Sequence, residues 1–407
     1  MDKLSRRDVL KLGAAGGGAL ALGGVPHRGA RFRARAQADE IKIGLLAPVT
    51  GVFADFGDLM RKATDLAVQK VNAEGGILDR QLRVIAEDDQ GEPTVAAERA
   101  RKLLLQDEVD ILMGTVSSAT TLAVLPLVNQ AQKVFFYPLD GEDKACTPGG
   151  EGTNPLVFGL GDTPQQRLSQ FVPAIVEQYG AQWYLIGNDY VFPRSVNAVA
   201  IQYLEAAGGE VVREDYVPLG TSDYQPIIDR IANSGAQVVF STTVGTDGVA
   251  FTKQARESGL FDRMTVTGVA TFAPEVYSGL QGFADGVLTA DRYSEAVDNP
   301  VNAEFVESFK TTYDYNLPLG GTAAACYGAV LIWREAATLA NSFDPEPFAQ
   351  ACEGLQMTLP QGEVEIDATN HLLKQHIYLL RIENDAYLIE QDFGQLSHPG
   401  HEGCSVE

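Results

Sequence analysis

Residues 41–76 read IKIGLLAPVTGVFADFGDLMRKATDLAVQKVNAEGG, and their pattern decides the fold. The apolar run at 41–46 predicts a buried strand that a proline and a glycine bring to an end. Residues 56–74 carry apolar side chains at helical spacing and stop at a pair of glycines. Residues 82–86 form the next apolar run, so a strand, a helix and a second strand follow in order.

The same alternation runs through most of the chain. In the first half it predicts strands at 110–113 and 134–137 and helices at 93–106 and 118–132. After a loop at 146–155 it predicts strands at 183–186, 211–217, 238–241 and 264–267, and helices at 163–179, 194–207, 224–234 and 248–258. Further helices are expected at 303–313, 322–340 and 347–353, then a strand at 362–366 and an antiparallel pair at 375–382 and 387–391. Two doubly wound α/β lobes are therefore expected.

The first 38 residues have the composition of a cleaved export signal. A basic start precedes an apolar run at 12–25, and small residues allow cleavage after Ala36 or Ala38. Residues 5–11, SRRDVLK, resemble a twin-arginine signal, which routes folded proteins outward. We expect a periplasmic protein that does not insert into the membrane after cleavage, since no internal stretch is apolar enough to span a bilayer.

The chain is strongly acidic, with a formal net charge of −23. The first 38 residues hold 8 of the 31 basic and 2 of the 54 acidic residues, which leaves −29 for the remainder. Phosphate contacts require a basic face, so nucleic acid is excluded as a partner.

The cysteines favour disulfides over a metal site. Cys146, Cys326, Cys352 and Cys404 form no CxxC pair and no cluster with the spacing of zinc ligands. Export permits disulfides, and Cys146 with Cys404 is the first pair we expect, because both lie in loops rich in glycine and proline.

Motifs of catalysis are missing. No G-x-S-x-G elbow, phosphate-binding loop or G-x-G-x-x-G fingerprint opens a helix after a strand. The five histidines show no pairing with a nucleophile. We predict no enzymatic activity, no catalytic residue and no cofactor.

The candidate site lies in loops that follow strands, because ligands of open α/β sheets sit at the carboxyl ends of the strands. These loops are 114–121, 136–142, 187–194 and 241–248. Ser118 stands at a helix start, where its hydroxyl either caps the helix or meets a carbonyl or carboxylate of a ligand.

Two sets of residues resemble a known family. Residues 41–46, 50–51 and 71–77 resemble the opening of type I periplasmic binding proteins of the branched-chain amino-acid class. Residues 137–138, 163–166, 186–194 and 360–371 look like the branch that binds urea and short-chain amides. The likeness covers about residues 41 to 391.

The resemblance implies a two-lobed protein with a three-segment hinge that hands a small molecule to the membrane permease of an ABC importer. It implies one lobe of residues 39–160 and 295–362 and another of 161–294 and 363–407. It also implies that Ser118, Tyr137, Tyr190 and Thr246 line the ligand pocket.

Departures from the family pattern leave the ligand open. Leu139 and Asp140 stand where an aromatic residue and a glutamate are usual, and Phe192 replaces a common tyrosine. Urea or a short amide is the first expectation. If the carboxylates of Asp140 and Asp247 face the cleft, an amino acid or cationic amine is the alternative. A sensor that signals to a partner protein is a third.

Overall fold

The first sheet is parallel throughout, as the βαβ pattern predicted. The computed structural model describes residues 40–139 and 154–398, and the predicted export signal, Asp140, Cys146 and Cys404 lie outside them. The strand order is β2-β1-β3-β4-β5. The strands are β1 (Ile41–Leu46), β2 (Leu82–Glu87), β3 (Ile111–Met113), β4 (Val134–Tyr137) and β5 (Val157–Gly159).

The second sheet is mixed, with the order β11-β12-β13-β10-β9-β8-β6-β7 and β14 paired to β13. Its parallel part comprises β6 (Gln182–Asn188), β7 (Glu210–Val217), β8 (Val238–Thr242), β9 (Thr265–Gly268) and β10 (Leu288–Asp291). The antiparallel part comprises β11 (Gln356–Leu359), β12 (Gly362–Ile366), β13 (Leu373–Glu383) and β14 (Ala386–Leu396). The predicted C-terminal hairpin therefore extends the second sheet.

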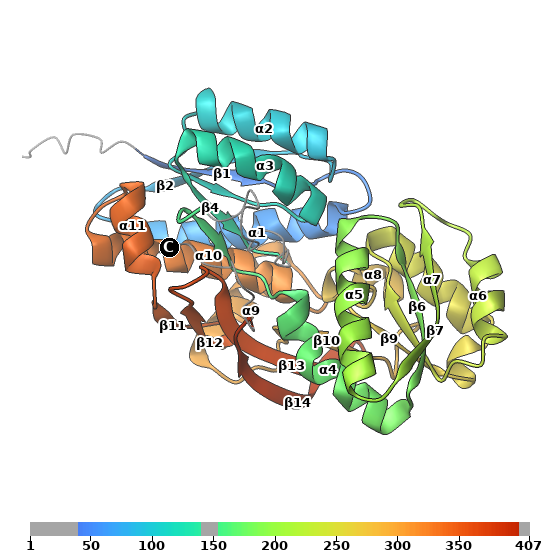
Figure 1. The fold of residues 1–407 in the computed structure, drawn as a ribbon. Coiled ribbons are helices and arrows are strands. Elements are labelled where there is room, and N and C mark those ends of the chain that lie inside the picture. The colour runs from blue at the N-terminus through green and yellow to red at the C-terminus, as the bar shows by residue number, and fades with distance from the viewer. Residues whose placement is uncertain (1–39, 140–153, 399–407) are drawn as a thin grey trace, which may run out of the picture. The chain divides into compact units, whose positions relative to one another are not determined.

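Helices cover both faces of the parallel strands. Against the first sheet, α2 and α3 pack on one face while α1 and α10 pack on the other (Figure 1). In the second lobe, α4 and α5 lie together, and α6, α7 and α8 lie on the opposite side (Figure 1). The helices are α1 (Ala54–Ala73), α2 (Pro93–Leu105), α3 (Ser118–Ala131), α4 (Pro164–Tyr179), α5 (Val191–Ala206), α6 (Gln225–Ala232), α7 (Gly245–Glu257), α8 (Tyr277–Leu280), α9 (Pro300–Tyr313), α10 (Gly321–Ala340) and α11 (Pro345–Cys352).

Two helices that carry predicted site residues, α5 and α7, begin three residues earlier than the sequence pattern indicated. The start of α5 at Val191 places Pro193 in its first turn, a position that tolerates proline because those N–H groups have no helical partner. The start of α7 lies at Gly245, a residue type with low helix propensity. Phe192 and Asp247 therefore lie in first helical turns rather than in loops.

Three short strands were not predicted from the pattern, namely β5, β10 and β11. Each has three or four residues, which is too few for an alternation to show. Cys326 and Cys352 are buried and free. Within the described ranges, no helix is long and apolar enough to cross a bilayer, and no group of three side chains suits a metal ion.

A buried ion cluster lies where the chain passes from β5 to α4. Asp162 accepts hydrogen bonds from the Nε and Nη2 of Arg167 and from Nη1 of Arg292. Arg292 also donates to the carbonyl of Pro138 at 3.3 Å. Burial by itself would raise the pKa of Asp162, but the two guanidinium charges hold it at about 2.

We expect Asp162→Asn to lower the free energy of unfolding by about 3–5 kcal/mol at neutral pH, because two buried arginines lose their counter-charge. A depressed folded-state pKa contributes stability above the unfolded value near 4 and loses it as pH falls towards 2. The difference between wild type and variant should therefore shrink over that range in urea denaturation. Asp58→Asn, which breaks the exposed pair with Lys62, is the control and should cost about 1 kcal/mol or less. A pH-independent difference for Asp162→Asn would contradict this account.

Candidate functional site

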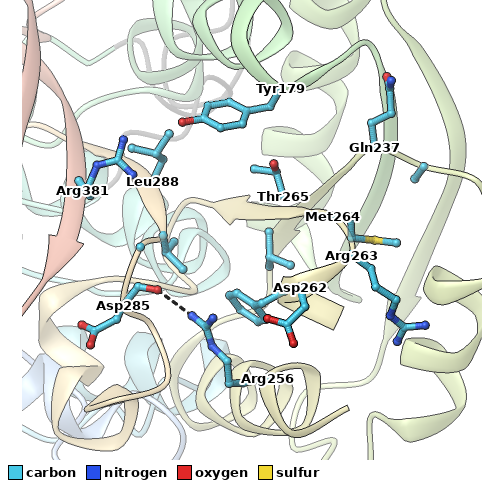
Figure 2. Close-up of a pocket in the computed structure, with 15 residues that line it drawn as sticks. Tyr179, Gln237, Arg256, Asp262, Arg263, Met264, Thr265, Asp285, Leu288 and Arg381 are labelled. Carbon is cyan, nitrogen blue, oxygen red and sulfur yellow. Dashed lines mark hydrogen bonds between the residues drawn. The ribbon is translucent and has the colours of Figure 1, made fainter. Parts of the chain in front are cut away.

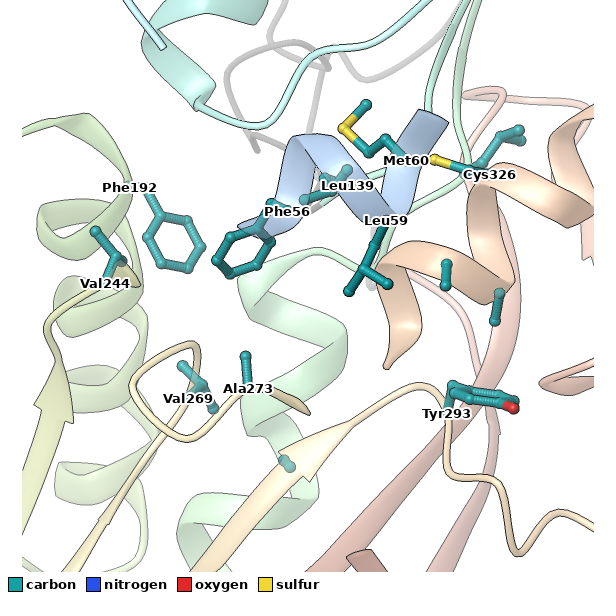
Figure 3. Close-up of a cluster of buried hydrophobic side chains, with 14 of the residues drawn as sticks. Phe56, Leu59, Met60, Leu139, Phe192, Val244, Val269, Ala273, Tyr293 and Cys326 are labelled. Atoms are coloured by element: carbon teal, nitrogen blue, oxygen red, sulfur yellow. The ribbon is translucent and has the colours of Figure 1, made fainter. Parts of the chain in front are cut away.

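The carboxyl ends of strands from both sheets lead into one buried apolar cluster (Figure 3). From the first lobe, Phe56 follows β1 and Leu139 follows β4. From the second lobe, Phe192, Val244 and Val269 follow β6, β8 and β9. All five side chains are buried. The cluster thus lies between the lobes, at the strand ends where a ligand is expected.

Aromatic rings form a continuous path across the cluster. Figure 3 shows the rings of Phe56, on α1, and Phe192, on α5, directed toward one another. The ring of Phe53 has its centroid 6.4 Å from that of Phe56 and 6.5 Å from that of Tyr190. The Tyr190 ring lies 6.4 Å from Phe192. Two rings from each lobe therefore meet in the cleft at distances typical of attractive aromatic pairs.

The start of α3 supplies a polar edge in the first lobe. Ser117, not Ser118, is the N-cap, and its Oγ accepts from the N–H of Ala119 at 3.3 Å. The hydroxyls of Thr115 and Thr121 lie 2.8 Å apart and satisfy one another. Ser118 is buried, and within 40–139 and 154–398 its hydroxyl makes no hydrogen bond. Its hydroxyl therefore has capacity for a ligand atom.

A narrow cavity lies beneath Phe192. Its wall includes Asp162, Arg167, Leu168 and Val269. The charges on this wall come from the ion cluster, in which Asp162 faces two guanidiniums. The wall of this cavity is thus apolar apart from the ion cluster.

Asp247 is tied to the protein itself. Its Oδ2 accepts from the Nδ2 of Asn188 at 2.7 Å and from the backbone N–H groups of Gly220 and Thr221 at 2.9 and 3.2 Å. Asn188 in turn accepts from the N–H of Val244 at 2.9 Å. Burial raises the pKa of Asp247, and the three donors lower it in part. The carboxylate therefore fastens the loop after β7 to the strand ends of β6 and β8.

The other residues predicted for the site lie in different places. Tyr137 packs with Phe135 in a second core cluster under α2 and α3, against Gly159 and Leu372. Thr246 is exposed in the first turn of α7. Asp140 lies outside the described residues. Leu139, Tyr190 and Phe192 are the predicted residues that the structure brings together, with Ser118 on a neighbouring strand end.

Three residues of the cluster were not among those predicted from the sequence: Phe56, Val244 and Val269. Each follows a strand that the sequence pattern predicted. Because ligands of such sheets bind at the carboxyl ends of strands, these residues could have been selected from the sequence. Phe56 was predicted only as the first residue of its helix.

Another cavity lies away from this cluster, at the amino ends of β8, β9 and β10, with a volume of about 620 Å³ (Figure 2). Its arginines already have partners in the protein. Arg256 donates to the carbonyls of Phe283 and Asp285 and stacks on a phenyl ring, while Arg381 pairs with Glu390. These contacts hold the surface of the second lobe together and leave the apolar cluster between the lobes as the candidate site.

Two doubly wound lobes with a cleft at their strand ends define a type I periplasmic binding protein fold. The sequence model of the family described as "Periplasmic binding protein" matches residues 40–386. The chain belongs to this family, and its relatives place it in the branched-chain amino-acid class.

The relatives cover most of the chain. A Brucella melitensis protein named "Leu/Ile/Val-binding protein homolog 6" is 26% identical over 357 residues, which cover 85% of this chain and 88% of that protein. A Rhodopseudomonas palustris solute-binding protein of an ABC transporter, solved with 3,4-dihydroxybenzoic acid, has a TM-score of 0.82 at 24% identity and covers 88% and 99% of the two chains. A leucine-binding protein of Thermotoga maritima has a TM-score of 0.77 at 19% identity, over 86% and 98%.

These findings identify the protein as a periplasmic solute-binding protein of an ABC transporter. Solute-binding proteins of ABC transporters among its structural relatives imply a small-molecule ligand and a membrane permease as partners. The relatives are named as binding proteins, which agrees with the absence of catalytic motifs from the sequence.

We expect Asp247→Ala to lower the free energy of unfolding by about 1–3 kcal/mol, since the buried amide of Asn188 and two partly buried backbone N–H groups lose their acceptor. Asp247→Asn keeps one oxygen and should lose less. Urea denaturation measures both variants, and ligand titration should show wild-type affinity for each. A large loss of affinity at unchanged stability would show instead that Asp247 contacts the ligand.

Proposed function

We propose that the solute is a small molecule with an apolar body, aromatic or branched aliphatic, and a carboxylate at one end. The apolar lining from both lobes carries this proposal. Phe56 and Leu139 on one side and Phe192 and Val269 on the other offer a ligand no polar partners over most of its surface. Such a surface favours an apolar ligand by about 0.8 kcal/mol for each buried CH₂ group.

The start of α3 is the proposed site of the carboxylate. Ser118 offers a hydroxyl, and the first turn of the 14-residue helix offers backbone N–H groups and the positive end of its dipole. Ser117 already caps the helix, so the Ser118 hydroxyl can serve the ligand without loss of the cap. A carboxylate bound here would direct the apolar part of the solute toward the phenyl rings.

The relatives support this chemistry. Leucine, isoleucine and valine, in the name of the Brucella relative, and 3,4-dihydroxybenzoic acid, in the Rhodopseudomonas structure, each join a carboxylate to an apolar or aromatic body. The two ligand classes differ in one respect: the amino acids carry an ammonium group, and the benzoic acid does not. Asp247 accepts three hydrogen bonds from the protein, which leaves a benzoate-type acid as the ligand that the described residues favour.

Urea or a short-chain amide, the first expectation from the sequence, stays a prediction. Such a ligand is polar over its whole surface, and along the ring path between Phe56 and Phe192 only Tyr190 carries a hydrogen-bonding group. A cationic amine would need the carboxylate of Asp140.

We also propose the lobe boundaries and the export route that the sequence predicted. The lobes divide into residues 39–160 with 295–362 and residues 161–294 with 363–407, and the protein is exported by the twin-arginine route. The packing of α10 on α1 and the pairing of β13 with β10 support this division.

A thermal-shift screen of the exported protein tests the ligand class. We expect benzoate-type acids to raise the melting temperature with concentration, since a ligand at 100 times its Kd adds about 2.7 kcal/mol of stability. Leucine, isoleucine and valine form the second group, and urea, acetamide and a polyamine the third. A shift with the third group alone would overturn the proposal.

Variants of the adjacent residues Ser117 and Ser118 distinguish a ligand contact from a helix cap. Ser118→Ala should weaken binding of the carboxylate ligand by about 1–3 kcal/mol and leave the melting temperature of the free protein unchanged. Ser117→Ala is the matched control and should cost about 0.5–2 kcal/mol of stability with little change in affinity. Calorimetric titration and thermal unfolding measure both. Equal affinity for Ser118→Ala and wild type would remove Ser118 from the site.

A further inference from the structure

The two lobes also meet through backbone at one edge of the cleft. Gly245, at the start of α7 in the second lobe, lies against the carbonyl group of Val52, in the loop after β1 of the first lobe. A Cβ atom added at Gly245 would lie 2.2 Å from the carbonyl oxygen of Val52, closer than the 3.0 Å that real Cβ contacts keep. Only a residue without a side chain permits this approach.

The neighbours of these two residues belong to the cleft. Val244 precedes Gly245 and lies in the apolar cluster. Phe53 follows Val52, and its ring lies 6.5 Å from that of Tyr190 on the other lobe. The contact between Gly245 and Val52 is therefore continuous with the apolar cluster that both lobes line, and a movement that separates the lobes would break it.

We infer that Gly245 is a positioning residue that sets how closely the two lobes approach one another over the ligand. The inference rests on the proposed binding of a solute between the lobes. A side chain at position 245 would act as a wedge against the carbonyl of Val52 and hold the lobes apart. The closed state would become less populated, and the apparent Kd would rise in proportion.

Gly245 also has a left-handed backbone, with φ of +54°, so any substitution adds local strain. Gly235 supplies the matched control. It lies in the same lobe, between α6 and β8, has φ of +80°, and has nothing within 4 Å of an added Cβ. Gly235→Ala therefore introduces comparable strain without a contact to the first lobe.

The affinity and the radius of gyration of the two variants are compared with those of wild type, with 4-hydroxybenzoate and leucine as probe ligands. We expect Gly245→Ala to weaken binding by about tenfold or more relative to Gly235→Ala, because the apparent Kd scales inversely with the closed fraction. Its radius of gyration with probe, from small-angle X-ray scattering, should stay above that of Gly235→Ala. Equal affinity and equal compaction in the two variants would overturn the inference.

A second measurement needs no ligand. Cysteines in place of Phe53 and Tyr190 report closure through their rate of joining by a short bis-maleimide, with each single-cysteine variant as control. Gly245→Ala in this background should slow the reaction, and Gly235→Ala should not. Equal rates would overturn the inference even if no probe binds, whereas absent binding with slowed crosslinking would count against the proposed ligand alone.

Discussion

The buried carboxylate of Asp162 is the constraint on which the cleft depends. It lies at the passage from the first sheet to the second and faces Arg167 of α4 and Arg292 at the end of β10. Arg292 also binds the carbonyl of Pro138, one residue before Leu139. A buried charge is tolerated only while its partners stay in place, so these segments keep one relative arrangement at the floor of the cleft.

Above this floor, neighbouring polar residues have separate tasks. Ser117 caps α3 while the adjacent Ser118 keeps its hydroxyl for another partner. One carboxylate oxygen of Asp247 accepts hydrogen bonds from backbone N–H groups of the loop after β7. Some polar side chains at the strand ends are therefore already hydrogen-bonded to nearby backbone. Only the remaining polar groups are available to bind a ligand. In this protein they are few, and apolar surface dominates.

Because different residues hold the fold and line the proposed site, family membership does not determine which ligand the protein binds. Relatives of the same fold hold branched aliphatic or aromatic acids, and the scaffold that positions the strand ends is common to them. In the proposed site, specificity would reside in the side chains between the lobes, such as Leu139 and Phe192, and in how closely the lobes approach. The second property depends on small contacts such as that of Gly245 with Val52, since a single added carbon would separate the backbones.

Hydrophobic periodicity was enough to predict the α/β class, the two doubly wound lobes and most helices and strands, because it reports which face of each element is buried. It also identified the strand ends that form the cleft. The tertiary structure decided which side chains face that cleft. In β4, alternation sends Phe136 to one face and Tyr137 to the other, into the cluster under α2 and α3. Asp247 was a ligand candidate until its partners, Gly220 and Thr221, proved to be backbone groups 27 and 26 residues away. Local pattern cannot reveal such partners, since they are adjacent only after the chain has folded.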